Sequence, residues 1–302
     1  MSFSSTIPAI AFFFSYAYSP AKKRIAAGSY DGRVAVYEPA QQTPIWVASK
    51  SEWHPAEVYA LAWSPDGSAL ASCGMGRTIK VWNTDGYLFQ EWEAHSDTVI
   101  VDLAWSPDGR YLASVGSDGM VRVWAMGTNH EHEPISTYDH DCYVASVAWS
   151  PDGRQLASGN SLGDIVLSDP QTGVKLKAYI GSLATEPDNL EMNEINALAW
   201  SPNGMHLACS QTSVGGNIGI IQIFSIQQDT SIVYNSGCGW LPQRLTWANG
   251  HTVMAADMDG CIHQLRCSSD ELVLEAEQRH CASIGEGMCF FNEETYITTF
   301  PA

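Results

Sequence analysis

The sequence predicts an all-β protein in which one small antiparallel unit recurs along the chain. The string Leu-Ala-Trp-Ser-Pro-Asp-Gly occupies 61–67 and 103–109, and slightly altered copies occupy 147–153 and 198–204. No segment shows helical periodicity over the length that a helix needs. A strand and a turn that return at nearly fixed spacing indicate that one supersecondary unit is stacked many times.

An aromatic residue just before the turn marks each unit. The residue before this anchor is always small, being Ala, Thr or Cys. Because neighbouring residues of a strand face opposite sides, this pairing suits sheets that are packed closely on both faces. Successive anchors are 42 to 51 residues apart, and they are Tyr18, Trp63, Trp105, Trp149, Trp200, Trp247 and Phe290.

Each unit is expected to contain four short strands, and the third unit shows them most clearly. Its segment Ser106–Gly109 has Pro at the second position and Gly at the fourth, as a type I turn prefers. The pair Asp118-Gly119 marks the next turn. The strands of this unit are expected at 99–105, 111–115, 120–124 and 135–138.

These repeats resemble the WD-repeat β-propeller family over nearly the whole chain. The resemblance implies a single domain, 1–302, that forms a seven-bladed propeller of four-stranded antiparallel blades. Each blade buries its apolar faces against its neighbours. The blades are expected at approximately 11–50, 55–93, 96–139, 141–180, 194–235, 239–278 and 283–302 together with 1–10.

The last unit is short, because only one strand, within 295–300, fits between Phe290 and the end of the sequence. The resemblance implies that the N-terminal segment 1–10 adds an outer strand and closes this blade, which still leaves about three strands. Three explanations stay open: a three-stranded blade, a chain cut from a longer one, or a partner strand added by edge pairing.

The resemblance also implies a buried hydrogen-bonded set of four side chains. In the third unit the set is complete, and its members are His95, Ser114, Asp118 and Trp124. The second unit keeps His54, Ser72 and Trp82 but has Gly76 at the Asp position, and the fourth keeps His140 and Ser158. A Ser-His-Asp protease is disfavoured, because a catalytic group has no need to recur in degraded copies. A structural role is expected.

Composition narrows the classes of partner. The 302 residues are 45% hydrophobic, enough for a large core, and the net charge of −18 disfavours direct nucleic-acid contact and favours basic proteins as partners.

No apolar run reaches the roughly 18 residues of a membrane span, and the apolar segment 9–18 is expected to be a strand. Eight cysteines without a C-x-x-C pair suggest free thiols in a reducing compartment, the cytoplasm or nucleus.

By the resemblance, two long loops, 180–193 and 211–217, lie on one face of the propeller. Long loops on a rigid scaffold are frequent binding elements, and the first carries Glu186, Asp188 and Glu191. The residue at which the chain enters the first strand of each blade should lie around the mouth of the propeller's central channel, with Trp240 beside these residues. They are Phe12, Glu57, Thr98, Tyr143, Glu194, Leu241 and Ile284. Their apolar and acidic character predicts a peptide partner with an apolar anchor and a Lys or Arg.

No cofactor or metal is expected. The cluster His130-Glu131-His132 lacks a third ligand nearby, and Gly215-Gly216 lacks the Lys and Ser/Thr of a phosphate loop. The predicted function is therefore a non-enzymatic scaffold, a subunit of a multi-protein complex. Two alternatives stay open: an enzyme or small-molecule binder that uses the central channel, and a chromatin- or RNA-associated subunit that acts through protein contacts.

Overall fold

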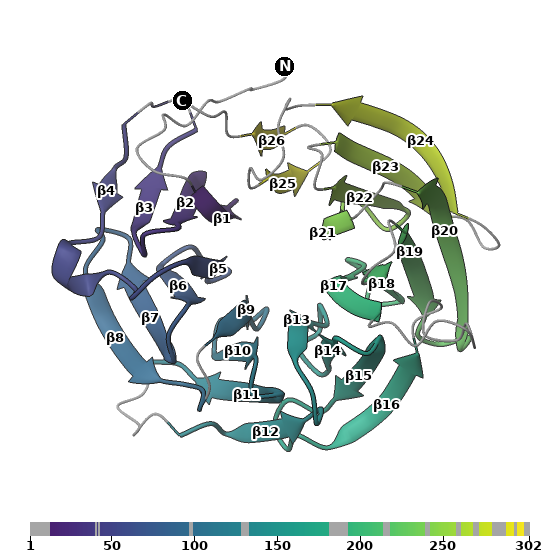
Figure 1. The fold of residues 1–302 in the computed structure, drawn as a ribbon, viewed down its shortest axis with the longest axis horizontal. Helices are drawn as coiled ribbons and strands as arrows, with labels where there is room; N and C mark the ends of the chain where they lie inside the picture. The colour runs from purple at the N-terminus through teal and green to yellow at the C-terminus, as the bar shows by residue number, and fades with distance from the viewer. Residues whose placement is uncertain are drawn as a thin grey trace. The chain divides into compact units, whose positions relative to one another are not determined.

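A computed structural model shows that the chain is built almost entirely from β-strands (Figure 1). It describes residues 13–39, 41, 43–96, 99–127, 133–180, 193–213, 218–238, 242–257, 261–267, 272–279, 288–292 and 295–298. Among these residues the one helical segment is the short 3-10 helix η1 (Lys50–Glu52). The described part of the chain contains no helix long and apolar enough to cross a bilayer.

The chain forms two compact units. Unit 1 comprises residues 1–139 and 285–302, and unit 2 comprises residues 140–284. Unit 1 contains three four-stranded sheets and one pair of strands. The three sheets consist of β1 (Phe13–Ser19), β2 (Arg24–Ser29), β3 (Val34–Tyr37) and β4 (Trp46–Val47); of β5 (Val58–Trp63), β6 (Ala69–Gly74), β7 (Thr78–Asn83) and β8 (Leu88–Glu93); and of β9 (Ile100–Trp105), β10 (Tyr111–Gly116), β11 (Met120–Ala125) and β12 (Ser136–Asp139). The pair consists of β25 (Met288–Asn292) and β26 (Thr295–Thr298).

Unit 2 contains three further four-stranded sheets. They are β13 (Val144–Trp149), β14 (Leu156–Asn160), β15 (Asp164–Ser168), β16 (Lys175–Ile180); β17 (Asn193–Trp200), β18 (His206–Ser213), β19 (Ile218–Ser225), β20 (Thr230–Cys238); and β21 (Pro242–Trp247), β22 (Thr252–Asp257), β23 (Cys261–Cys267), β24 (Leu272–Arg279).

Every one of these sheets is an antiparallel meander in which strands that follow one another in sequence are paired (Figure 1). The prediction of an all-β fold made of four-stranded antiparallel units is therefore confirmed. The seven-blade count and the closure of the last blade by residues 1–10 stay predictions, because 1–12 lie outside the described residues.

The recurrent Ser-Pro-Asp/Asn-Gly segments form the turns that join the first and second strands. In the second repeat, the Gly67 N–H donates to the Ser64 carbonyl at 2.8 Å, and the Ser64 hydroxyl donates to Asp66 at 2.7 Å. The glycine adopts a φ of +68° in this copy and between +69° and +71° in the other three. Only glycine adopts this left-handed conformation without a steric cost, which explains its recurrence.

The anchor tryptophans connect neighbouring sheets inside each of the two compact units. The indole N–H of an anchor donates to the carbonyl of the small residue that precedes the anchor of the sheet before it, over 3.0 to 3.2 Å. A small residue lets the indole approach this carbonyl. The four pairs are Trp63 with Ala17, Trp105 with Ala62, Trp200 with Ala148 and Trp247 with Ala199.

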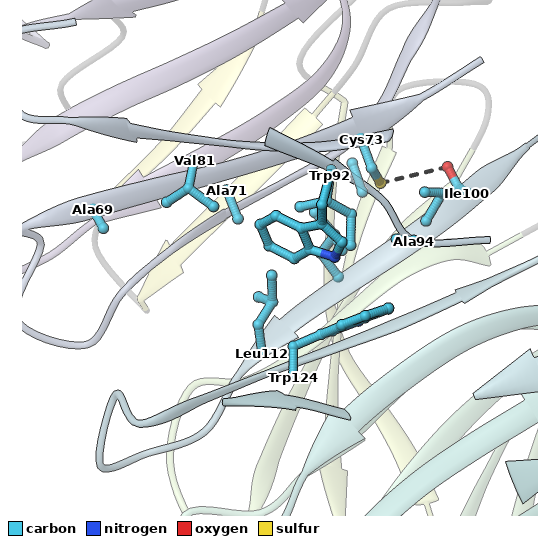
Figure 2. Packing of buried hydrophobic residues seen from close by; sticks show 12 residues of the cluster. Ala69, Ala71, Cys73, Val81, Trp92, Ala94, Ile100, Leu112 and Trp124 are labelled. Atoms are coloured by element: carbon cyan, nitrogen blue, oxygen red, sulfur yellow. Dashed lines mark hydrogen bonds between the residues drawn. The ribbon is translucent and has the colours of Figure 1, made fainter. Parts of the chain in front are cut away.

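The hydrophobic core lies between adjacent sheets. Figure 2 shows the layer between the sheets β5–β8 and β9–β12, where Trp92 packs against Leu112 and Trp124. The rings of Trp92 and Trp124 meet edge to face with their centroids 5.6 Å apart. The thiol of Cys73 donates to the Ile100 carbonyl at 3.4 Å in the same layer. Cys73 and Cys209 are buried free thiols.

The prediction that residues 211–217 form a loop is wrong for the first three of them. These residues belong to β18, which pairs with β17 through Gln211 with Ile195, Thr212 with Glu194 and Ser213 with Asn193. The hairpin is longer than expected because its polar residues continue the antiparallel ladder, and Gln211 is buried in it. Ile180 and Asn193, the ends of the other expected loop, also lie in strands, and residues 181–192 are outside the described part of the chain.

Candidate functional site

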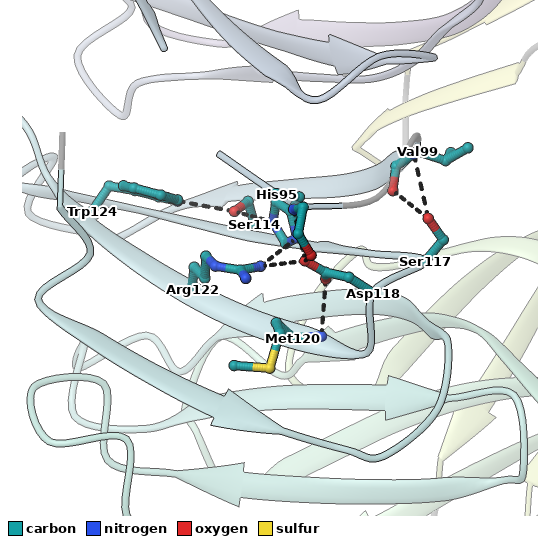
Figure 3. A network of polar contacts seen from close by, with 9 residues as sticks. His95, Val99, Ser114, Ser117, Asp118, Met120, Arg122 and Trp124 are labelled. Carbon is teal, nitrogen blue, oxygen red and sulfur yellow. Dashed lines mark hydrogen bonds and ion pairs between the residues drawn. The ribbon is translucent and has the colours of Figure 1, made fainter. Parts of the chain in front are cut away.

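The structure brings the four polar side chains of the third repeat together. Figure 3 shows how β10 and β11 position Ser114 and Trp124 beside His95, while Asp118 comes from the turn between these strands. His95 Nε2 lies 2.8 Å from the Ser114 hydroxyl, and His95 Nδ1 lies 2.8 Å from Asp118 Oδ1. The Trp124 indole N–H donates to the Ser114 oxygen at 2.9 Å.

One assignment of hydrogens satisfies this chain of groups. The Trp124 N–H donates to Ser114, the Ser114 hydroxyl donates to His95 Nε2, and the His95 Nδ1–H donates to Asp118. This order is the one that a Ser-His-Asp hydrolase uses. Here, however, Ser114 and the His95 side chain are both 0% exposed, so no substrate can reach the hydroxyl. The arrangement can stabilise the sheet, and burial excludes hydrolysis at this serine.

A fifth residue, Arg122, completes the network and was missed by the sequence reasoning. It lies on β11, where its Nη1 donates to Asp118 Oδ2 at 2.8 Å (Figure 3). Burial by itself would raise the pKa of Asp118, but hydrogen bonds from His95, Arg122 and the Met120 N–H hold that pKa well below its ordinary value. Asp118 is therefore a buried carboxylate that carries its charge at neutral pH.

The second repeat contains the same set without its carboxylate. His54 Nε2 lies 2.8 Å from the Ser72 hydroxyl, and the Trp82 N–H donates to Ser72 at 2.9 Å. Gly76 stands where the third repeat has Asp118, and the buried His54 Nδ1 has no hydrogen-bond partner among the described residues. Lys80, which matches Arg122 in position, instead pairs with Glu91 at 2.6 Å.

His54 is expected to stay neutral down to low pH. Burial, aided by the charge of Lys80, lowers its pKa from 6.5 to about 3. In this interval the unfolded chain binds a proton at His54 that the folded chain does not, so the free energy of unfolding should fall as pH drops from 6.5 toward 3. In an NMR titration from pH 8 to 5, the His54 ring signal, assigned by its loss in His54→Asn, should not shift. A midpoint near 6.5 would contradict this burial.

The fourth repeat uses different residues around its histidine. His140 Nε2 lies 2.7 Å from the Ser158 hydroxyl, as the resemblance implied. Leu162 stands where the third repeat has Asp118, and Asn160 replaces that Asp in the network by approaching both His140 Nδ1 and Asp164 at 3.4 Å. The sequence offered a signal for this substitution, because Asn160 and Asp164 flank the turn between β14 and β15.

Three of the residues expected to contact a partner are described by the structure. Glu57 is half-buried directly before β5, and its carbonyl accepts from the Met75 N–H at 2.8 Å. Tyr143 directly precedes β13, and Glu194 lies inside β17, where burial raises the pKa of its carboxyl group. The others lie outside the described residues, and they are Phe12, Thr98, Glu186, Asp188, Glu191, Trp240, Leu241 and Ile284. The surface that these residues were expected to share stays a prediction.

The described residues contain no group of three His, Cys, Asp or Glu side chains in a metal-binding arrangement. The cluster His130-Glu131-His132 lies outside them.

Comparison with known proteins locates these repeats independently. The family "WD domain, G-beta repeat" matches residues 48–83, 86–125 and 132–167, which cover more than a third of the chain. The second matched segment contains His95, Ser114, Asp118 and Trp124. The hydrogen-bonded set thus lies inside a matched repeat.

Similar curated proteins carry the same repeats. The chain is 32% identical over 80 residues to "Probable cytosolic iron-sulfur protein assembly protein 1" of Scheffersomyces stipitis, which covers 23% of this chain and 22% of that protein. It is 31% identical over 68 residues to "WD repeat-containing protein 1" of Mus musculus and 34% identical over 68 residues to "Actin-interacting protein 1" of Drosophila melanogaster. Each of these two alignments covers 22% of this chain and 11% of the relative.

The matches therefore span only about a fifth or a tenth of the relatives' own lengths. This chain therefore contains three segments that match the WD-repeat family model, and it is similar to WD-repeat proteins over short alignments.

Proposed function

We propose that this protein is a non-enzymatic scaffold, a subunit of a multi-protein complex that presents the ends of its first strands to a peptide or protein partner. WD-repeat proteins generally serve as interaction scaffolds, and this supports the proposal at the level of class. The observation that carries it is the burial of the Ser114, His95 and Asp118 network. The polar groups of this network bind each other and stabilise the sheet, so we assign the function to residues on the protein surface.

The relatives' names point in the same direction. One is named for iron-sulfur protein assembly and another for interaction with actin. Both names describe an action on other proteins. We therefore propose this general role for the chain, and we propose neither iron-sulfur proteins nor actin as its partner. The buried thiols Cys73 and Cys209 suit a reducing compartment, so the proposal locates the protein in the cytoplasm or nucleus.

Charge indicates the kind of partner. The chain carries a net charge of −18, and Glu57 is half-buried at the start of β5. In unit 2 the neighbouring first strands β13 and β17 bring Tyr143 and Glu194 to corresponding ends. Acidic and aromatic residues at the ends of neighbouring strands suit a segment with Lys or Arg next to an apolar residue.

Quantitative affinity purification of the tagged full chain tests the proposal. We expect Glu57→Lys and Glu194→Gln each to lose bound partners about tenfold, because each removes an acceptor for a basic side chain. The matched control is Glu93→Lys, since Glu93 is exposed on the outer strand β8, where it pairs with Arg77. Partners retained equally by all three variants would overturn the assignment of Glu57 and Glu194 to partner binding, provided that circular dichroism shows each variant folded.

A further inference from the structure

A pocket of about 460 Å³ lies in unit 2, between the sheets β17–β20 and β21–β24. Its walls come from the start of β18, the hairpin that joins β19 to β20, the start of β22 and the end of β23. This volume falls within the range of about 300–1,000 Å³ that is typical of small-molecule sites. None of the buried networks described above uses its lining residues.

Part of the pocket lining is apolar. Ile223 on β19 is 1% exposed, and Ile232 faces it from the paired position on β20. Cys267, at the end of β23, is also buried here, and its burial raises the pKa of its thiol, so the sulfur is uncharged at neutral pH. These three residues adjoin the core between the two sheets, so the pocket offers an apolar surface to a ligand.

The rest of the lining is polar but carries no permanent charge. It includes Gln227, Gln228 and Ser231 from β20 and its preceding turn, His206 at the start of β18, and His251 directly before β22. Among the described residues that line the pocket, none is Asp, Glu, Lys or Arg. In a chain with a net charge of −18, such a lining disfavours a charged ligand and suits a neutral one.

His206 supplies an unused hydrogen-bonding group. Its ring stacks on Trp247 with centroids 6.0 Å apart and an interplanar angle of 28°, which fixes its orientation. Its Nδ1 is buried and has no hydrogen-bond partner among the described residues. Burial, with the nearby charge of His251, lowers the pKa of His206 below its ordinary value, so the ring is neutral at pH 7. Unlike Ser114, His206 lines a pocket, so a ligand that enters the pocket and contacts this ring can supply the hydrogen bond that it lacks.

We propose that this pocket receives a neutral side chain with an apolar body and one hydrogen-bonding group, a tyrosine phenol of a protein partner. The ring would lie against Ile223 and Ile232, and its hydroxyl would bond to His206. The phenol matches each feature: a flat apolar surface, one donor-acceptor group and no charge. The assignment of a protein as the source rests on the proposed scaffold function.

The pocket can be tested without the partner, using 4-ethylphenol as the probe and the methyl signals of the full chain in NMR. We expect saturable shifts at Met205, Ile223 and Ile232, with a dissociation constant on the order of millimolar. Ethylbenzene, which lacks the hydroxyl, should bind roughly fivefold more weakly. The 4-ethylbenzoate anion should not bind, because none of the described lining residues is Lys or Arg.

Two matched substitutions on β20 localise the binding. Ile232→Trp fills the pocket and should abolish the shifts, whereas Val233→Trp, at a neighbouring position that is 44% exposed, should leave them unchanged. His206→Phe keeps a ring on Trp247 and should reduce 4-ethylphenol to the affinity of ethylbenzene. Absence of saturable shifts, or equal loss in the Ile232 and Val233 variants, would overturn the proposal.

The outcome is separable from that of the scaffold proposal. If Glu57→Lys loses partners but 4-ethylphenol does not bind, the pocket assignment is wrong and the scaffold function stands. If the probe binds as expected while Glu57→Lys and Glu194→Gln retain every partner, the pocket stands and the assignment of these two residues to partner binding is wrong.

Discussion

Replacing Asp118 by alanine is expected to lower the free energy of unfolding of unit 1 by about 3–5 kcal/mol. The carboxylate side chain is 6% exposed and accepts hydrogen bonds from His95, Arg122 and the Met120 N–H. Its removal leaves the Arg122 guanidinium, only 15% exposed, without its partner. Urea denaturation followed by far-UV circular dichroism measures the loss.

The matched control for Asp118→Ala is Glu93→Ala. Glu93 also forms an ion pair in unit 1, with Arg77 at 3.2 Å, but both side chains are at least half exposed. Solvent screens such a pair, so the expected loss is below about 1 kcal/mol. Similar losses in the two variants would show that burial of the Asp118 network contributes nothing.

The effect of Asp118→Ala should also depend on pH. The pKa of Asp118 is held below its ordinary value of 3.8, so its contribution to stability is present above that pH. The contribution is lost as pH falls through the lower folded value. The difference between wild type and variant should therefore be constant near neutrality and shrink only in strong acid.

Replacing Trp82 by alanine is expected to cost unit 1 about 3–5 kcal/mol. Trp82 is 0% exposed, its ring lies 6.0 Å from that of Trp46, and its N–H donates to Ser72 at 2.9 Å. Alanine leaves a cavity between the sheets β1–β4 and β5–β8 and removes a donor from the buried serine. The midpoint of urea unfolding, read by far-UV circular dichroism, should fall accordingly.

Two further variants separate the parts of this effect. Trp82→Phe keeps most of the packing and loses the hydrogen bond, so its cost should be smaller than that of alanine by about 1–3 kcal/mol. Tyr87→Ala removes an aromatic ring that is 70% exposed in the same sheet region and should change stability by less than about 0.5 kcal/mol. A Trp82→Ala protein as stable as Tyr87→Ala would contradict the packing seen here.

Much of the fold could be predicted because its signals are local. A turn such as Ser64–Gly67 is held by hydrogen bonds among its own residues, and its glycine adopts a positive φ. The same physics acts on every copy, so the letters recur wherever the turn does. The complete set in the third repeat was likewise predictable, since four matching residue types stand at family positions.

The variations among repeats were less predictable. Arg122 and Lys80 occupy matching strand positions, yet the first binds Asp118 and the second binds Glu91. The choice depends on whether a carboxylate lies in the preceding turn, and on how far each cation can reach. Asn160 entered the fourth repeat's network from a position that the family pattern does not mark.

The sequence by itself determined the strand-turn-strand units, the aromatic anchors and the small residues beside them, because each follows from contacts within a few residues. Only the tertiary structure decided what these residues meet. Trp105 donates to the Ala62 carbonyl of the sheet before it, and His206, Ile232 and Cys267 converge on one pocket from separate strands. Such contacts join residues far apart in the chain, and their partners are selected by the packing of whole sheets, which no local pattern records.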